Sequence, residues 1–187
     1  MLRELDRRIT AYHEAGHVVV GHLMGFCVND VYNEGTTKTG KRTEGVTVFA
    51  SDEYSWRSAS EHFSDHVLAH EKQAKICVAG RIAEQLFFPN DWSRYRSRSD
   101  WECLKKELEY SLMKTSTVVN STRKLLSRKE NKRLVRRVAW VLYHRGHIDR
   151  FGMPIILGSK KRRWRIKRKL KQIFSKIKKR VEQLVKK

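Results

Sequence analysis

The most constraining feature of this chain is a short motif near its N-terminus, which reads Tyr-His-Glu-Ala-Gly-His over residues 12–17. His13 and His17 are four residues apart, so on a helix both imidazoles leave the same face about one turn apart. Two neutral imidazoles at that separation can bind one zinc ion, and Glu14 can then reach a water on the metal and act as general base. The motif predicts a helix that carries a zinc site for peptide-bond hydrolysis.

The motif also has a simpler interpretation, as two surface histidines on an ordinary helix. The flanking residues argue against it, because Ile9 precedes the motif and three valines follow directly over 18–20. A helix with these flanks exposes little surface, and buried histidines need polar partners or a metal. We expect this helix to span 4–24 and to end at Gly25.

Composition sets limits on the class of protein. The chain has 187 residues, 40% of them hydrophobic, with five Trp and a net charge of +21, which suits one domain with a basic appendage and excludes general disorder. A charged N-terminus and the absence of long apolar runs predict no signal peptide and no membrane span. We therefore expect a cytoplasmic protein, with peripheral attachment to a membrane left open. Three widely spaced cysteines, Cys27, Cys77 and Cys103, argue against a disulfide framework and are expected to be small buried residues.

Apolar periodicity and turn residues divide the rest of the domain into elements. They predict strands over 26–34 and 43–50 joined by a polar loop, followed by helices over 61–88, 99–115 and 122–145. The expected fold is mainly α with a minor α+β character. It is a zincin-like helical peptidase domain with a small β-hairpin or meander and a basic C-terminal amphipathic helix.

The C-terminal residues 159–187 form a separate feature, with fifteen Lys and Arg against a single acidic residue, Glu182. Apolar residues recur there at helical spacing from Ile166 to Leu184, which predicts an amphipathic helix. We expect a peptidase domain over 1–151, a linker over 152–158 and this basic tail.

The basic tail has three interpretations. It can lie on an anionic membrane, bind nucleic acid through phosphate neutralisation, or pack its apolar stripe on protein. Its charge favours an electrostatic partner, and the candidate contact residues are Arg163, Arg165, Lys167, Arg168, Lys171, Lys178 and Lys179.

A catalytic zinc site usually has three protein ligands, so a third one is needed. Metzincins use a further histidine, but residue 23 is Leu at that place, which excludes the class. A glutamate from a later helix, such as Glu61, Glu71 or Glu84, or an aspartate at a downstream helix start remains open. Asp100 fits the last pattern, because it lies in the first turn of a predicted helix, where the helix dipole favours a carboxylate. The same position also fits plain capping without a metal.

Several segments together resemble the peptidase domain of FtsH-type ATP-dependent zinc proteases. Residues 11–17 read Ala-Tyr-His-Glu-Ala-Gly-His, and 79–88 read Ala-Gly-Arg-Ile-Ala-Glu-Gln-Leu-Phe-Phe, which is similar to that family's Gly-Gly-Arg-x-Ala-Glu helix with Ala79 for the first Gly. Ser99-Asp100-Trp101 falls where the family has Ser-Asn-Asp-Leu, and the similarity runs over about residues 8–150. The family's ATPase and transmembrane segments have no counterpart here.

The resemblance implies roles for individual residues. It makes Asp100 the third zinc ligand, with Asp91 and Glu102 as alternatives, and it makes the strand segment Gly45, Val46, Thr47 and Val48 the edge that holds substrate by backbone pairing. Arg81 and Glu84, three residues apart on one helical face, are expected to make structural pairs. Relatives form rings, which leaves a homo-oligomer open for this chain, and no nucleotide is expected as a partner.

Together these features predict an ATP-independent zinc endopeptidase that acts on flexible or unfolded protein segments. His13, His17 and Asp100 would hold the zinc, and Glu14 would be the general base. The alternative is a weak or inactive peptidase fold that serves as a binding or regulatory module, targeted by its basic tail.

Overall fold

The computed structural model describes residues 2–33, 35–36, 42–43, 45–49, 63–91 and 98–158. The helices are α1 (Leu2–Leu23), α3 (Phe63–Phe87), α4 (Arg98–Leu108), α5 (Thr115–Ser127), α6 (Lys129–Arg145) and α7 (Met153–Leu157), and the strands are β1 (Val28–Tyr32), β2 (Gly35–Thr36), β3 (Arg42–Thr43), β4 (Val46–Phe49) and β5 (His147–Asp149). The predicted tail helix and its seven candidate contact residues lie outside these ranges.

The described residues confirm the expected fold class, which is mainly helical with a small sheet. The main sheet has three antiparallel strands in the order β4-β1-β5. The predicted pairing of the two early strands is present, with Val31 opposite Thr47 and Tyr32 opposite Val46. The third strand, β5, was not predicted, because three residues after a helix carry too short a pattern to read.

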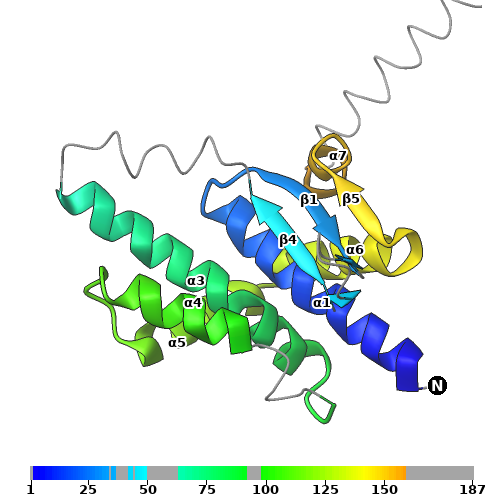
Figure 1. Ribbon diagram of the computed structural model, residues 1–187, viewed down its shortest axis with the longest axis horizontal. Coiled ribbons are helices and arrows are strands. Elements are labelled where there is room, and N and C mark those ends of the chain that lie inside the picture. The colour runs from blue at the N-terminus through cyan, green and yellow to red at the C-terminus, as the bar shows by residue number, and fades with distance from the viewer. Residues whose placement is uncertain are drawn as a thin grey trace, which may run out of the picture.

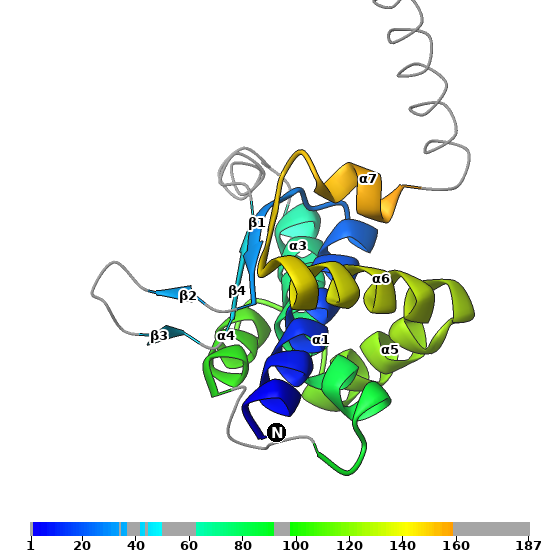
Figure 2. The same ribbon diagram turned by 90° about the vertical axis from the view of Figure 1, so that its right-hand side faces the viewer.

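Helix α1 is the centre of the molecule. It contacts α3 and α6 as well as strands β1 and β4, and Figure 1 shows it between α3 and the sheet. Its residues Ala11, Ala15, Val18, Val19 and Val20 have no exposed surface. Seen from the side, α5 and α6 lie on the other flank of α1 from β1 and β4 (Figure 2). This arrangement encloses the motif in the core, as its flanks predicted.

Two glycines, Gly25 and Gly146, end helices, and Gly25 does so where the sequence predicted. Gly25 follows α1 with a φ of 92°, and Gly146 follows α6 with a φ of 75° and donates its N–H to the carbonyl of Leu142 at 2.8 Å. Both glycines adopt a left-handed backbone conformation, which is strained for residues with a Cβ atom but not for glycine.

The predicted helix over 122–145 is wrong in two respects, since the helical region begins earlier, at Thr115, and consists of two helices. Arg128 is extended, with φ −61° and ψ 139°, and separates α5 from α6. The side chain of Asn131 donates to the carbonyl of Leu125 at 2.8 Å, in addition to the longer bond of 3.4 Å that this carbonyl accepts from the N–H of Arg128. Apolar spacing alone continues through this break, so the pattern did not reveal it.

The predicted helix over 99–115 is too long. Helix α4 ends at Leu108, and Tyr110 and Leu112 in the segment that follows are exposed. The hydroxyl of Ser111 accepts from the N–H of Met113 at 3.0 Å, a local bond that competes with helix formation.

The segment predicted as a linker, 152–158, contains helix α7. Met153, Ile156 and Leu157 are buried against the core, so these residues form part of the packed structure and not a spacer. Across the described residues, no helix combines the length and apolarity needed to cross a bilayer.

Candidate metal centre

Close packing of α1 on α3 brings the two motif histidines into the interior. Gly16 on α1 lies against the backbone of Ala79, and Gly80 on α3 lies against both imidazoles, where an added Cβ would come within 2.5 Å of each Nε2 atom. Only glycine permits this approach. His13 and His17 are each 8% exposed as a result.

The outer nitrogen of each ring has a defined partner. His13 Nδ1 donates to Glu84 Oε1 at 2.8 Å, and His17 Nδ1 donates to the carbonyl oxygen of Ile76 at 2.8 Å. A carbonyl can only accept, so His17 Nδ1 carries a hydrogen, and the carboxylate of Glu84 imposes the same tautomer on His13. In the neutral rings, both Nε2 atoms therefore present lone pairs.

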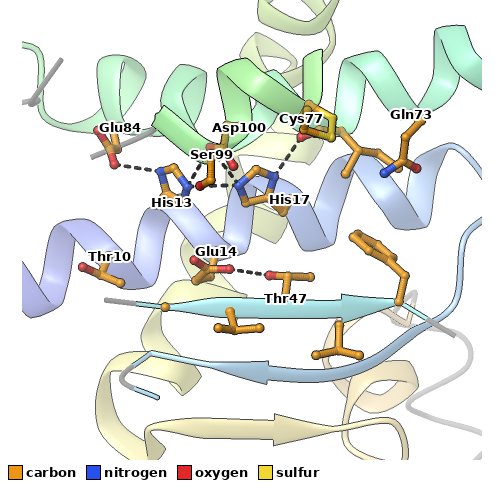
Figure 3. A pocket seen from close by; sticks show the side chains of 16 residues that line it. Thr10, His13, Glu14, His17, Thr47, Gln73, Cys77, Glu84, Ser99 and Asp100 are labelled. Atoms are coloured by element: carbon orange, nitrogen blue, oxygen red, sulfur yellow. Dashed lines mark hydrogen bonds and ion pairs between the residues drawn. A yellow bond between two sulfur atoms is a disulfide. The ribbon is translucent and has the colours of Figure 1, made fainter. Parts of the chain in front are cut away.

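Asp100 completes a group of three facing atoms. It lies in the first turn of α4, and its Oδ2 is 3.1 Å from His13 Nε2 and 3.4 Å from His17 Nε2. The two Nε2 atoms are 3.0 Å apart. Figure 3 shows the three side chains converging from α1 and α4.

The electrostatics of this group call for a cation. Burial lowers the pKa of His13, but the carboxylates of Asp100 and Glu84 outweigh it and raise that pKa to about 10. Burial likewise opposes the charge on His17, yet Asp100 raises its pKa as well. Burial raises the pKa of Asp100, but His17 and His13 bring it below its usual value. Three lone-pair atoms this close repel one another unless protons or a metal ion lie among them.

The donor set fits zinc. Two imidazole nitrogens and one carboxylate oxygen are a common ligand set for a catalytic zinc ion, with a further position for water. In the described part of the chain, His13, His17 and Asp100 form a cluster that can hold a metal ion, since their ligand atoms all lie within 4.8 Å of one another. With both rings neutral and their Nε2 atoms unprotonated, the buried Asp100 Oδ2 has no hydrogen-bond donor, which is the state expected of an oxygen that binds a metal.

The two alternative ligands named with the family resemblance, Asp91 and Glu102, lie elsewhere. Asp91 is exposed beyond the end of α3, and Glu102 accepts from Arg98 at 3.1 Å on the outer face of α4. Neither belongs to the three-residue group.

Glu14 lies on the other side of α1, toward the sheet. It is 5% exposed and accepts from the hydroxyl of Thr47 at 2.5 Å. A pocket of about 660 Å³ connects it to the histidines and is lined by the predicted substrate strand, Gly45 to Val48, as well as by Asp100. The described strands leave β4 at the edge of its sheet, so its backbone can pair with an extended chain.

The cysteine prediction is only partly right, because Cys77 is buried as expected, whereas Cys103 is half-buried and Cys27 is exposed. Contrary to the prediction, Cys77 on α3 and Cys103 on α4 form a disulfide, with Cα atoms 6.1 Å apart. The two bonded residues are 26 positions apart in sequence, and only the packing of α4 on α3 brings them together. The disulfide ties the helix that carries Asp100 to the helix that carries Glu84.

Two contributions to the site were missed. The sequence interpretation placed Glu84 in a structural pair on its own helix, but it is 1% exposed and bonded to His13. Such carboxylate–histidine contacts orient metal ligands. For Glu84, a buried glutamate in an apolar helix was the available signal in the sequence. The carbonyl of Ile76 gives no such signal, because every residue has a backbone carbonyl.

No family model matches the chain. Over 88 residues, 47% of its length, the chain is 31% identical to the ATP-dependent zinc metalloprotease FtsH 3 of Symbiobacterium thermophilum. The match spans 13% of that relative, so the activity of the whole relative is not carried over by it. The similarity indicates a distant relation to FtsH-type metalloproteases.

Proposed function

We propose that this chain is a zinc endopeptidase that cleaves flexible or unfolded protein segments without ATP. The observation that carries the proposal is the convergence of His13, His17 and Asp100, with both Nδ1 atoms occupied by acceptors. This arrangement leaves three buried lone-pair atoms facing one another beside a carboxylate-lined pocket. The distant FtsH relation supports the same class of chemistry.

Each residue has a distinct part in the proposed reaction. His13, His17 and Asp100 would hold zinc, which supplies Lewis acidity that lowers the pKa of water and polarises a peptide carbonyl. Glu14 takes the proton from the attacking water and then delivers it to the leaving amine. Its low exposure keeps this exchange away from bulk solvent.

The pocket favours an extended substrate. Residues Gly45 to Val48 line it along β4, and a strand edge recognises the backbone of a peptide whatever its side chains. A folded protein does not offer a free backbone, so we expect cleavage only in segments that are already extended. Addition of ATP is expected to leave the rate unchanged.

The first experiment compares the wild type with Glu14→Gln on a fluorescently labelled unfolded protein at equal measured zinc content. The near-isosteric amide cannot accept the proton, so we expect a loss of rate of roughly 100-fold or more. Equal cleavage by both proteins would refute the catalytic assignment.

The ligand assignment needs a separate measurement. Asp100→Ala is expected to weaken zinc binding strongly, whereas Asp91→Ala, a matched loss of a carboxylate at an exposed position, leaves it unchanged. Zinc affinity is read by competition with a chromophoric chelator. If Asp100→Ala binds zinc like the wild type, the assignment fails.

A second candidate function is an inactive binding module, and the basic surface gives it a specific basis. Residues 114–145 contain ten Lys and Arg and one acid, Glu130, so positive charge is not confined to the tail. Lys129, Arg133 and Arg136 are exposed along α6, near Trp140, which is 63% exposed. This face and the tail together favour a polyanionic partner.

The polyanion proposal is tested by binding of the full chain to duplex DNA, to single-stranded DNA and to phosphatidylserine vesicles at several salt concentrations. Substitution of Arg163, Arg165, Lys167 and Arg168 by Gln should weaken binding and reduce its salt dependence. Unchanged binding to every ligand would reject the partner assignment for these tail residues. A protein that binds DNA or vesicles but shows no Glu14-dependent cleavage would favour the binding module over the peptidase.

A further inference from the structure

One hydrogen bond joins the strand at the pocket to the motif carboxylate. Thr47 Oγ1 on β4 donates to Glu14 Oε2 on α1 at 2.5 Å, and Figure 3 shows the two side chains pointing toward each other. Hydrogen bonds to a charged acceptor are roughly twice as strong as neutral ones. The contact therefore constrains the orientation of the carboxylate.

The other oxygen of the same carboxylate, Oε1, lies beside Gly45, which has no side chain to cover it. A Cβ atom at this position would collide with Glu14 Oε1 and Cγ and with Thr10. Alternate residues of a strand share a face, so 45, 47 and 49 all face α1, and the ring of Phe49 correspondingly lies against Gly21. Strand β4 thus holds Glu14 between a residue without a side chain and a hydroxyl donor.

We propose that Thr47 is a positioning residue that fixes the rotamer of Glu14 for proton transfer, an inference that rests on the proposed peptidase function. With Oε2 held by the hydroxyl, Oε1 is the oxygen that accepts the proton from water and returns it to the leaving amine. An unrestrained glutamate would populate rotamers that turn Oε1 away from the reacting atoms. Because β4 also offers its backbone edge to the peptide, one strand aligns both the base and the substrate.

The kinetic test uses variants that separate the hydroxyl from the shape of the residue. Thr47→Val keeps the branched side chain and suits a strand but removes the donor, and Thr47→Ser restores the donor. We expect kcat for Thr47→Val to fall roughly 10-fold to 100-fold with KM little changed, and Thr47→Ser to recover most of the rate. Thr117→Val, at an exposed position on α5, is the matched control and should behave as wild type.

Zinc content and circular dichroism are measured for every variant. An unchanged kcat in Thr47→Val would overturn the proposal. So would a fall in kcat that tracks loss of zinc or of helix, or one that Thr47→Ser fails to rescue, because these outcomes describe a purely structural residue.

A second readout does not depend on activity. In thermal unfolding of the zinc-loaded full chain, Thr47→Val and Glu14→Leu each remove one partner of the bond, so the double variant should lose less in Tm than the sum of the two single losses. Strictly additive losses in Tm would show that the two side chains do not stabilise each other and would overturn the proposal. If the wild type and Glu14→Gln cleave equally, the peptidase function itself has failed, while this cycle still decides whether Thr47 holds Glu14.

Discussion

Gly80→Ala is expected to abolish zinc binding while leaving the fold largely intact. The added methyl carbon would lie 2.5 Å from Nε2 of both His13 and His17 and 2.7 Å from Cδ2 of His13. Carbon and nitrogen atoms in contact need about 3.5 Å, so each ring must retreat by roughly 1 Å. Ligand distances in zinc sites tolerate only about 0.2 Å, and even indirect changes around a metal cost about 10-fold to 100-fold in affinity. We therefore expect the zinc affinity to fall more than 100-fold.

The cost to stability should be much smaller. Overpacking of a core typically costs about 1–3 kcal/mol, but alanine gains up to about 1 kcal/mol over glycine inside a helix. The net loss in the free energy of unfolding without metal is thus about 0–3 kcal/mol. Urea unfolding in the presence of a chelator measures this free energy of unfolding, and competition with a chelator for zinc measures the zinc affinity. Gly152→Ala, at the start of α7 with its nearest contact to Asp149 at 3.1 Å, is the control. A folded Gly80→Ala variant that binds zinc like the wild type would refute the geometry of the site.

Three further outcomes follow from the same structure. Glu84→Gln removes the charge that orients His13, so zinc affinity should fall about 10-fold to 100-fold, as measured by chelator competition; an unchanged affinity would contradict the orienting role. The raised pKa values of His13 and His17 stabilise the metal-free protein fully below about pH 6.5, and this contribution is lost as pH rises toward about 10. Zinc must displace these protons, so the zinc-induced rise in Tm should be larger at pH 8 than at pH 6, and an equal rise at both would contradict proton competition. The Cys77–Cys103 bond closes a 26-residue separation, so a reductant should lower the free energy of unfolding by about 3 kcal/mol in the wild type but not in Cys103→Ser.

The sequence predicts the parts of the site that depend on local periodicity. The spacing of His13 and His17 and their apolar flanks suffice to place both imidazoles inward on one helix, because helical geometry fixes that relation. Asp100 lies at a helix start, and the family resemblance pointed to it. These three residues lie together in the structure, although their metal binding stays a prediction.

The remaining features depend on contacts between distant segments. Glu84 reaches His13 across 71 residues, and Cys77 bonds Cys103 only because α4 packs on α3. Hydrophobic periodicity reports which face of a helix is buried but not which helix covers that face. The break between helices at Arg128 was not predicted for a related reason, because the apolar pattern continues in register on both sides of it.

The side chains of the motif face two different sides of helix α1. Consecutive residues on a helix are about 100° apart, so His13 and His17 face α3 and α4, whereas Glu14 faces β4. Zinc retention should therefore depend on the α3 and α4 side, and proton transfer on the β4 side. Glu84→Gln is expected to lose zinc and with it activity, and added zinc should restore turnover. Thr47→Val should keep its zinc and stay slow at any zinc concentration. A Thr47→Val protein rescued by added zinc would show that the two sides of the helix are not independent, and the division of roles would then be wrong.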